Sequence, residues 1–171
     1  MSYFLKTYLL FLPVILVSSC ISQTKNEAYV KEVECQCQLL DADTGLQKET
    51  IVTGISDGKN DVPSSSVSLA CNVRQTKYIK IEHKMMVNYI HDYQFYYKNK
   101  KLIKAKINIH NKEGSENQQI NYSAVYYIRR NKCIKSINEN LKWSDCDKVK
   151  DDSRTAFLDA FPLMNLLLRR K

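Results

Sequence analysis

Cysteine is the residue type with the most varied chemistry in this chain, and five of its six cysteines lie beyond position 30. In an oxidising compartment such thiols form disulfides. We expect Cys133 to bond to Cys146, and Cys71 to bond to either Cys35 or Cys37, which leaves one thiol over. The alternative is a soft-metal or redox site built from Cys35, Cys37 and Cys71. Because Cys-x-Cys is not the Cys-x-x-Cys spacing of zinc ribbons or thioredoxin-like enzymes, we predict no metal and no cofactor.

Two further sets of residues offer chemistry. His83, Met85, Met86 and His91 are soft ligands of the kind that bind Cu(I), although core packing explains the methionines equally well. Nucleophilic catalysis needs Ser or Cys beside His and a carboxylate. The chain contains no Gly-x-Ser-x-Gly, His-Glu-x-x-His or Gly-x-x-x-x-Gly-Lys motif. Asp92 follows His91, but adjacent side chains on a strand point to opposite faces. We therefore predict no catalytic residues and a protein that is not an enzyme.

Basic residues outnumber acidic ones, with 26 Lys+Arg against 18 Asp+Glu and a formal net charge of +8. The N-terminus, described next, predicts export, so we predict no nucleic-acid partner despite the nearby tyrosines. Anionic partners outside the cytoplasm are lipid head groups, lipopolysaccharide phosphates, peptidoglycan carboxylates and acidic proteins. The alternative is a solvated strand face whose lysines discourage edge-to-edge aggregation. The candidate partner-binding residues form one run without an acid: Lys98, Lys100, Lys101, Lys104 and Lys106.

Residues 1–19 have the three-part layout of a secretory signal peptide. A short basic start containing Lys6 precedes an apolar run from Thr7 to Val17, and two small residues follow. The run is shorter than the about 20 residues that a membrane-spanning helix needs. Pro13 would also disturb a stable helix there. We therefore expect this segment to be removed from the mature protein. One alternative is a cytoplasmic protein with a buried N-terminal helix.

The last residues of this segment, Val17-Ser18-Ser19-Cys20, resemble the lipobox of bacterial lipoproteins. The resemblance implies diacylglyceryl transfer to the Cys20 thiol, cleavage before Cys20 and acylation of the new amine. Several acyl chains anchor a protein stably, whereas a single chain does not. In lipoproteins of diderm bacteria an Asp after the cysteine commonly retains the protein in the inner membrane, so Ile21 implies the outer membrane, facing the periplasm. The alternative is a conventional secretory signal with Cys20 as an ordinary disulfide partner.

The mature chain divides into a short tether and one globular domain. Residues 20–32 are polar and lack periodicity, which suits a lipidated tether that lifts the domain off the bilayer. Residues 33–171 are enough for a single domain with its own hydrophobic core. Alternation of apolar and polar residues predicts strands with one buried face over 67–73, 85–97 and 101–109, with further candidates at 78–82 and 122–128.

The segment 96–104 is echoed about 30 residues later by the segment 126–135. In each segment, paired aromatic residues lead to Asn-Lys and then to aliphatic and basic residues. Asn tolerates a positive φ, so Asn99-Lys100 and Asn131-Lys132 are expected to form hairpin turns. The pattern resembles the tyrosine-rich hairpins of many small uncharacterised bacterial envelope proteins. That resemblance implies no activity, but two such hairpins give a four-stranded antiparallel meander.

The period changes to that of a helix near the C-terminus. Asp151-Asp152-Ser153 offers an N-cap and acids for the first turn, and basic residues end the chain. We predict a helix packed on the sheet and kinked or restarted at Pro162; the alternative is an amphipathic helix on a membrane surface. The fold class is therefore α+β, an antiparallel meander of about five to seven strands with a C-terminal helix. The apolar residues at helical spacing are Phe157, Phe161, Met164 and Leu168.

Together these patterns favour a non-catalytic, lipid-anchored protein of the cell envelope. We expect it to bind a partner protein through an exposed sheet edge or through its tyrosine-rich face. One version is an inhibitor or immunity protein that blocks a hydrolase or a toxin in the envelope. The alternative is an envelope carrier or sensor of a small ligand or metal ion, which would use the concave face of the sheet or the Cys-x-Cys pair.

Overall fold

The computed structural model of the protein describes residues 24–53, 64–72, 77–86, 89–111, 120–138 and 146–169. The predicted signal peptide, the lipobox and Cys20 lie outside these residues. Predictions that concern them therefore stay predictions.

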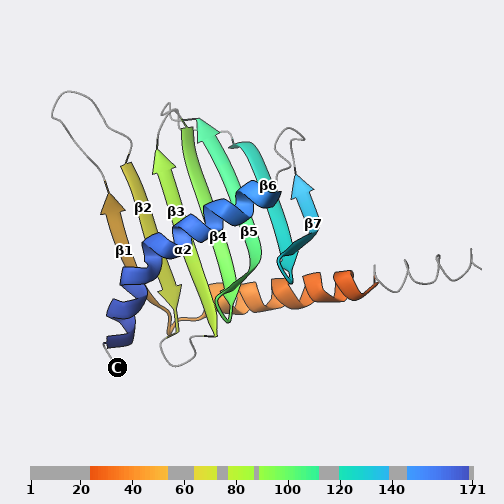
Figure 1. Ribbon diagram of the computed structural model, residues 1–171, viewed down its shortest axis with the longest axis horizontal. Coiled ribbons are helices and arrows are strands. Elements are labelled where there is room, and N and C mark those ends of the chain that lie inside the picture. The colour runs from red at the N-terminus through yellow and green to blue at the C-terminus, as the bar shows by residue number, and fades with distance from the viewer. Residues whose placement is uncertain are drawn as a thin grey trace, which may run out of the picture.

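The described chain forms a seven-stranded antiparallel sheet with one helix before it and one after it (Figure 1). The strands follow one another in sequence order from one edge to the other, so the predicted α+β meander with a C-terminal helix is confirmed. The N-terminal helix comprises residues 24–42. The other elements are β1 (Gln47–Thr53), β2 (Ser64–Cys71), β3 (Tyr78–Met86), β4 (Tyr89–Lys98), β5 (Lys101–Asn111), β6 (Ile120–Arg129), β7 (Lys132–Asn138) and α2 (Cys146–Arg169).

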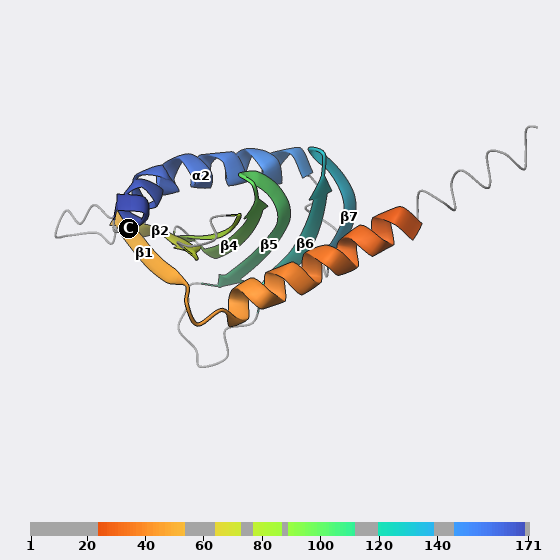
Figure 2. The ribbon, with the colours of Figure 1, turned by 90° about the horizontal axis from the view of Figure 1, so that it is seen from below.

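The sheet curves around α2, which lies across its concave face, while the N-terminal helix lies on the convex face (Figure 2). One sheet contributes side chains to two hydrophobic cores, because successive side chains of a strand point to opposite faces. On the concave side Leu69, Ile81 and Phe95 are fully buried beneath α2. This face is filled by the helix, so it offers no open concavity of the kind that we expected for a ligand carrier.

The tyrosines predicted to form a binding face are part of the two cores. Tyr97 and Tyr126 pack on the concave side, and their neighbours Tyr96 and Tyr127 pack on the convex side against the N-terminal helix. All four are at least 96% buried, with exposed fractions of 3%, 1%, 4% and 4% respectively. Consecutive tyrosines therefore serve opposite faces of one strand, and the expected tyrosine-rich binding face is wrong.

The N-terminal helix corrects the predicted domain boundary. We expected a tether over residues 20–32 and a domain that begins at residue 33, but residues 24–32 belong to the helix. Val30, Val33, Cys37 and Leu40 are buried against the convex face of the sheet. Their spacing of three and four residues is helical, but it crosses the predicted boundary and starts in a polar stretch. The folded domain therefore begins by residue 24.

The C-terminal helix is longer than expected and does not restart at Pro162, although its C-terminal part turns away from the direction of its first part (Figure 1). It begins at Cys146, so Ser153 lies inside it, and the Ser153 hydroxyl donates to the Lys150 carbonyl at 2.8 Å rather than capping the end. Pro162 lies within the helix and does not interrupt it. Pro162 cannot donate to the carbonyl of Leu158, but both residues are exposed, so water can satisfy that oxygen.

The two tyrosine-rich hairpins are structural copies of each other. Each has a two-residue turn with positive φ at both positions: 50° and 62° for Asn99 and Lys100, and 52° and 63° for Arg130 and Asn131. The register of each hairpin shifts at the equivalent place, after Tyr96 in β4 and after Tyr127 in β6. The second turn is therefore Arg130–Asn131, one residue earlier than the expected Asn131–Lys132.

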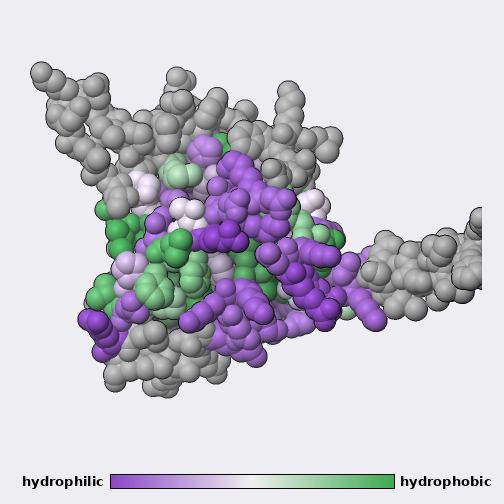
Figure 3. Space-filling view, in the orientation of Figure 1, coloured by the Kyte–Doolittle hydropathy of each residue, from purple (hydrophilic) through white to green (hydrophobic). Residues whose placement is uncertain are grey.

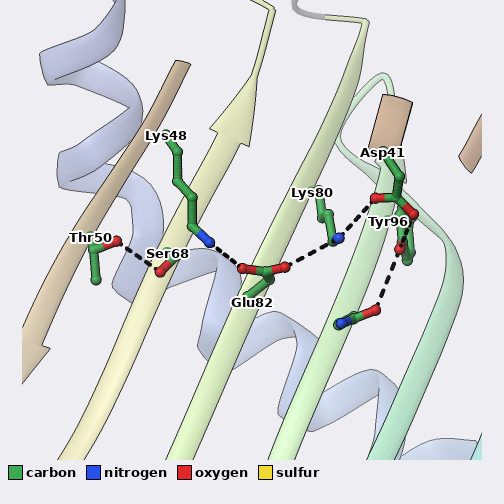
Figure 4. Close-up of polar contacts among 8 residues, drawn as sticks. Asp41, Lys48, Thr50, Ser68, Lys80, Glu82 and Tyr96 are labelled. Atoms are coloured by element: carbon green, nitrogen blue, oxygen red, sulfur yellow. Dashed lines mark hydrogen bonds and ion pairs between the residues drawn. The ribbon is translucent and has the colours of Figure 1, made fainter. Parts of the chain in front are cut away.

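A chain of polar contacts runs across the convex face and reaches the end of the N-terminal helix (Figure 4). The Glu82 carboxylate lies between the ammonium groups of Lys48, at 2.6 Å, and Lys80, at 3.1 Å. Lys80 also contacts Asp41 of the helix at 2.8 Å, and the Tyr96 hydroxyl donates to Asp41 at 2.9 Å. These contacts join β1, β3 and β4 to the C-terminal end of the helix.

Glu34 is the central polar contact of the same helix. Its carboxylate accepts a hydrogen bond from Lys104 at 2.9 Å and another from the hydroxyl of Tyr127. Burial alone would raise the pKa of Glu34, but these two hydrogen bonds outweigh it, so the pKa of the carboxyl lies below its ordinary value. The charged form of Glu34 therefore stabilises the docked helix.

We expect the docked helix to loosen in acid. The folded pKa of Glu34 is depressed, so its contribution is complete above the ordinary value of 4.5 and is lost as the pH falls through the lower folded value. Urea unfolding between about pH 6 and pH 3 should show falling stability for the unmodified chain. Glu34→Gln should be less stable at pH 6, by about 1 kcal/mol, and should show a shallower pH dependence. Equal slopes for the two proteins would contradict this role of Glu34.

Candidate functional site

A cleft of about 840 Å³ lies at one end of the sheet. It lies where the β4–β5 and β6–β7 turns meet the first half of α2, and Tyr29 of the N-terminal helix contributes to its wall. We call it the hairpin cleft. Figure 3 shows hydrophilic side chains gathered over the first half of α2 and the neighbouring hairpin ends, whereas apolar side chains gather over the second half. The apolar patch includes Leu158, Phe161 and Leu166, all exposed on α2.

The charged lining of the hairpin cleft is entirely basic. No Asp or Glu is among its described lining residues. Clustered cations facing one concavity produce a positive potential there, which attracts anionic groups. The basic lining residues are Lys98, Lys100, Lys101, Arg129, Arg130, Lys150 and Arg154.

Acids outside the cleft balance three of these cations. Lys98 pairs with Glu32 at 2.9 Å, Lys150 pairs with Asp147 at 2.5 Å, and Arg154 pairs with Asp151 at 3.4 Å. The hydrogen bond that Lys98 donates to Glu32 is the main reason that the pKa of Lys98 is raised, so Lys98 stays charged. The other four cations form no ion pair within the described chain; they are Lys100, Lys101, Arg129 and Arg130.

Apolar side chains form the floor of the cleft. Tyr97 is buried, and its ring lies 5.2 Å from that of Phe157 on α2. The Tyr97 hydroxyl donates to the carbonyl of Ser153 at 2.7 Å, so it is already satisfied. On the opposite wall, the Arg129 guanidinium lies 5.2 Å from the centre of the Tyr29 ring. The floor therefore offers apolar surface, and the charged groups of the cleft lie on its rim.

Two of the rim cations sit at strained backbone positions. Lys100 and Arg130 both have positive φ, which costs a residue with a Cβ roughly 1–2 kcal/mol relative to right-handed conformations. Glycine would avoid that cost, and Asn, present at the other position of each turn, tolerates it better. Strained residues tend to cluster at functional sites. Their basic side chains at these two turns therefore support a role for the rim.

Three of the five predicted lysines line the cleft, and the other two lie elsewhere on β5. Lys98, Lys100 and Lys101 line the cleft, as a partner-binding role would require. Lys104 instead holds Glu34 at 2.8 Å. Lys106 is half-buried on β5, opposite Gln94 and Val125.

Four basic residues of the rim were not among those predicted from the sequence. Arg129 and Arg130 occupy the second copy of the hairpin, so the internal repeat could have indicated them once Lys98 was singled out in the first copy. Lys150 and Arg154 reach the cleft from α2. Their spacing places them on one side of a helix, but no sequence pattern shows which end of the sheet that helix reaches.

The cysteines correct part of the predicted disulfide pattern. Cys71 is buried in the core beneath α2, whereas Cys37 is buried on the opposite face, under the N-terminal helix. Cys35 is exposed on that same helix. The sheet therefore separates Cys71 from both predicted partners, and the Cys71 disulfide is wrong. The same separation excludes a metal site that joins Cys71 to the Cys-x-Cys pair.

Cys133 and Cys146 lie beside each other as thiols. Burial is the main cause that raises the pKa of Cys146 to about 12, and a hydrogen bond with Cys133 adds to it. The structure holds both as free cysteines, so their disulfide stays a prediction. Cys133 follows the second turn and Cys146 begins α2, so this bond would join two walls of the hairpin cleft.

We expect oxidation of the full chain by glutathione disulfide to cross-link Cys133 to Cys146. Thiol–disulfide exchange forms the protein bond and reduces the added disulfide to two thiols. Peptide mapping by mass spectrometry without reductant should find the cross-linked pair, and Cys133→Ser should abolish it. A cross-link from Cys71 to Cys35 or Cys37 would contradict the placement of these residues on opposite faces.

The histidines of the candidate copper set pack around a core tyrosine. His83 and His91 flank Tyr93, with each ring centre 6.1 Å from that of Tyr93. Burial lowers the pKa of both histidines. Met85 packs against the core beneath α2, and the Met86 side chain lies outside the described part. Among the described residues, no three His, Cys, Asp or Glu side chains come together as metal ligands would.

Comparisons with protein-family models, curated proteins and solved structures found no match for this chain. Across the described part of the chain, neither helix has the length and apolar character needed to cross a membrane.

Proposed function

We propose that this protein is a non-catalytic, lipid-anchored protein of the cell envelope that binds an acidic partner protein at the hairpin cleft. The observation that carries the proposal is a concave site with seven basic lining residues and no acidic one in the described chain. An inhibitor or immunity protein that covers an acidic surface of a hydrolase or toxin is one form of this function. Electrostatic complementarity of this kind speeds association and selects the partner.

A carrier of a small anionic ligand is the second candidate. The volume of about 840 Å³ and the apolar floor around Tyr97 and Phe157 favour it. Ligand pockets are typically roughly 300–1,000 Å³ in volume, apolar in lining and equipped with a few fixed polar groups. A protein partner fits better, because the unpaired cations Lys100 and Arg130 are exposed on turns rather than enclosed.

The lipid anchor predicts a specific chemical difference between two variants. The unmodified chain, expressed in a bacterium that processes lipoproteins, should sediment with membranes and carry acyl chains on its N-terminal Cys20. Cys20→Ser should lose both properties, because the hydroxyl does not accept the diacylglyceryl group in place of the thiol. Mass spectrometry and membrane flotation measure the two outcomes. A Cys20→Ser protein that still floats, together with an unmodified chain without acyl mass, would contradict the anchor.

If the cleft binds the partner, substitutions at the two strained turns should weaken partner binding without lowering the stability of the fold. Lys100→Gly with Arg130→Gly removes two unpaired cations and relieves positive-φ strain, so stability should be unchanged or should rise by up to about 1 kcal/mol per site. The same protein should retain about tenfold less of its partner from a solubilised envelope extract, and the loss should shrink at high salt.

A matched control changes the same turns without changing charge. Lys100→Arg with Arg130→Lys exchanges the two basic side chains and keeps a cation at each of these positive-φ positions. This control should retain the partner as the unmodified chain does, at similar stability measured by urea unfolding. Full retention by the Lys100→Gly, Arg130→Gly protein would contradict binding at the cleft.

A further inference from the structure

The two hairpin copies differ in what their basic residues hold. In the first copy, Lys98 and Lys104 each contact a carboxylate of the N-terminal helix, Glu32 at 2.9 Å and Glu34 at 2.8 Å. In the first copy, therefore, basic side chains of the hairpin bind two acidic side chains of another segment of the same chain.

When the two copies are aligned with Tyr96 on Tyr127, the residues equivalent to Lys98 and Lys104 are Arg129 and Lys135. Arg129 lies over the Tyr29 ring, and Lys135 is exposed. Neither residue has an ion pair within the described chain. The second copy thus presents basic positions without the acids that occupy the first.

The second copy also carries an open edge. β7 pairs with β6 on one side, and no described strand pairs with its other side. An edge strand of this kind can pair with an extended segment of another chain. Lys132 and Lys135 are exposed along β7, and Ile137 is 46% exposed. No acidic residue occurs between Lys132 and Asn138.

The opposite edge of the sheet lacks this character. β1 contains Glu49 as well as Lys48, and the Lys48 ammonium is held by Glu82 at 2.6 Å. An acidic segment would therefore meet a carboxylate at β1 but only cations at β7. The β7 edge is also continuous with the hairpin cleft, because the turn residues Arg130 and Asn131 line that cleft directly before β7 begins.

We propose that an extended acidic segment of the partner protein adds to the sheet along β7 and continues into the hairpin cleft. Its backbone pairs with the open edge of β7, and its carboxylates contact Lys132, Lys135 and Arg130. This inference rests on the proposed function, because it assumes that the partner is an acidic protein. It adds the conformation of the bound segment and the strand that receives it.

The test uses two synthetic peptides and the full chain in detergent. The first is a fluorescein-labelled octapeptide of alternating Val and Glu, which is acidic and readily extended. The second has the same sequence with every backbone amide N-methylated, so it keeps its charge but has no backbone N–H on either edge to donate to β7. Fluorescence anisotropy should show binding of the first peptide and about tenfold weaker binding of the second.

Charge reversal on β7 provides the second arm. Lys132→Glu with Lys135→Glu should weaken binding of the first peptide by about tenfold or more. The matched control is Lys84→Glu with Arg169→Glu, which makes the same change of charge at exposed positions away from β7. It should change binding by less than about twofold if long-range charge is screened. Urea unfolding of each protein shows whether it remains folded.

Three results would overturn the inference: equal binding of the two peptides, binding unaffected by the β7 variant, or displacement of the first peptide by phosphatidylglycerol incorporated into the detergent micelles at equal charge concentration. The last result would assign the edge to lipid head groups. Failure here is distinguishable from failure of the proposed function. If the β7 variant retains the partner but the Lys100→Gly, Arg130→Gly protein does not, the result supports partner binding at the cleft and contradicts strand addition along β7.

Discussion

Burial of both faces of one curved sheet is the constraint on which the rest of this structure depends. Most of the middle strands have no solvent face, because α2 covers the concave side and the N-terminal helix covers part of the convex side (Figure 2). A shift of one residue in register would exchange the two faces of a strand. Tyr96 and Tyr97 would then swap cores, and the hydroxyl contacts to Asp41 and Ser153 would both be lost. The paired tyrosines thus fix the register.

The distribution of charge over the surface follows from the same packing of helices on the sheet. Acids of the N-terminal helix neutralise lysines on the convex face, as Glu34 does for Lys104. The strand ends at the two turns lie beyond this helix contact, so the cations of the turns have no comparable acids within the described chain. The molecule therefore concentrates its uncompensated positive charge at one end of the sheet. That concentration, rather than the net charge of +8, is what supports a binding site.

Much of the fold was predictable because strands and hairpins leave local signals. Alternation along 101–109 and the repeat of segment 96–104 correspond to β5 and to two hairpins with matching turns and register shifts. The N-terminal helix was missed because its apolar residues, such as Val33, are sparse and lie among charged ones. Some of those charges contact the sheet, as Glu34 does through Lys104, and composition cannot distinguish such contacts from solvated groups.

The sequence alone determined the elements whose signals are local: strands from alternation, turns from Asn beside a basic residue, and a C-terminal helix from the spacing of Phe157, Phe161 and Met164. The tertiary structure alone decided which groups meet. It placed Cys71 and Cys37 on opposite faces, made Lys104 a partner of Glu34, and brought cations of two turns and of α2 around one cleft. The physical reason is that pairing across a sheet and packing of helices on it join residues far apart in the chain, and no local pattern encodes those distances.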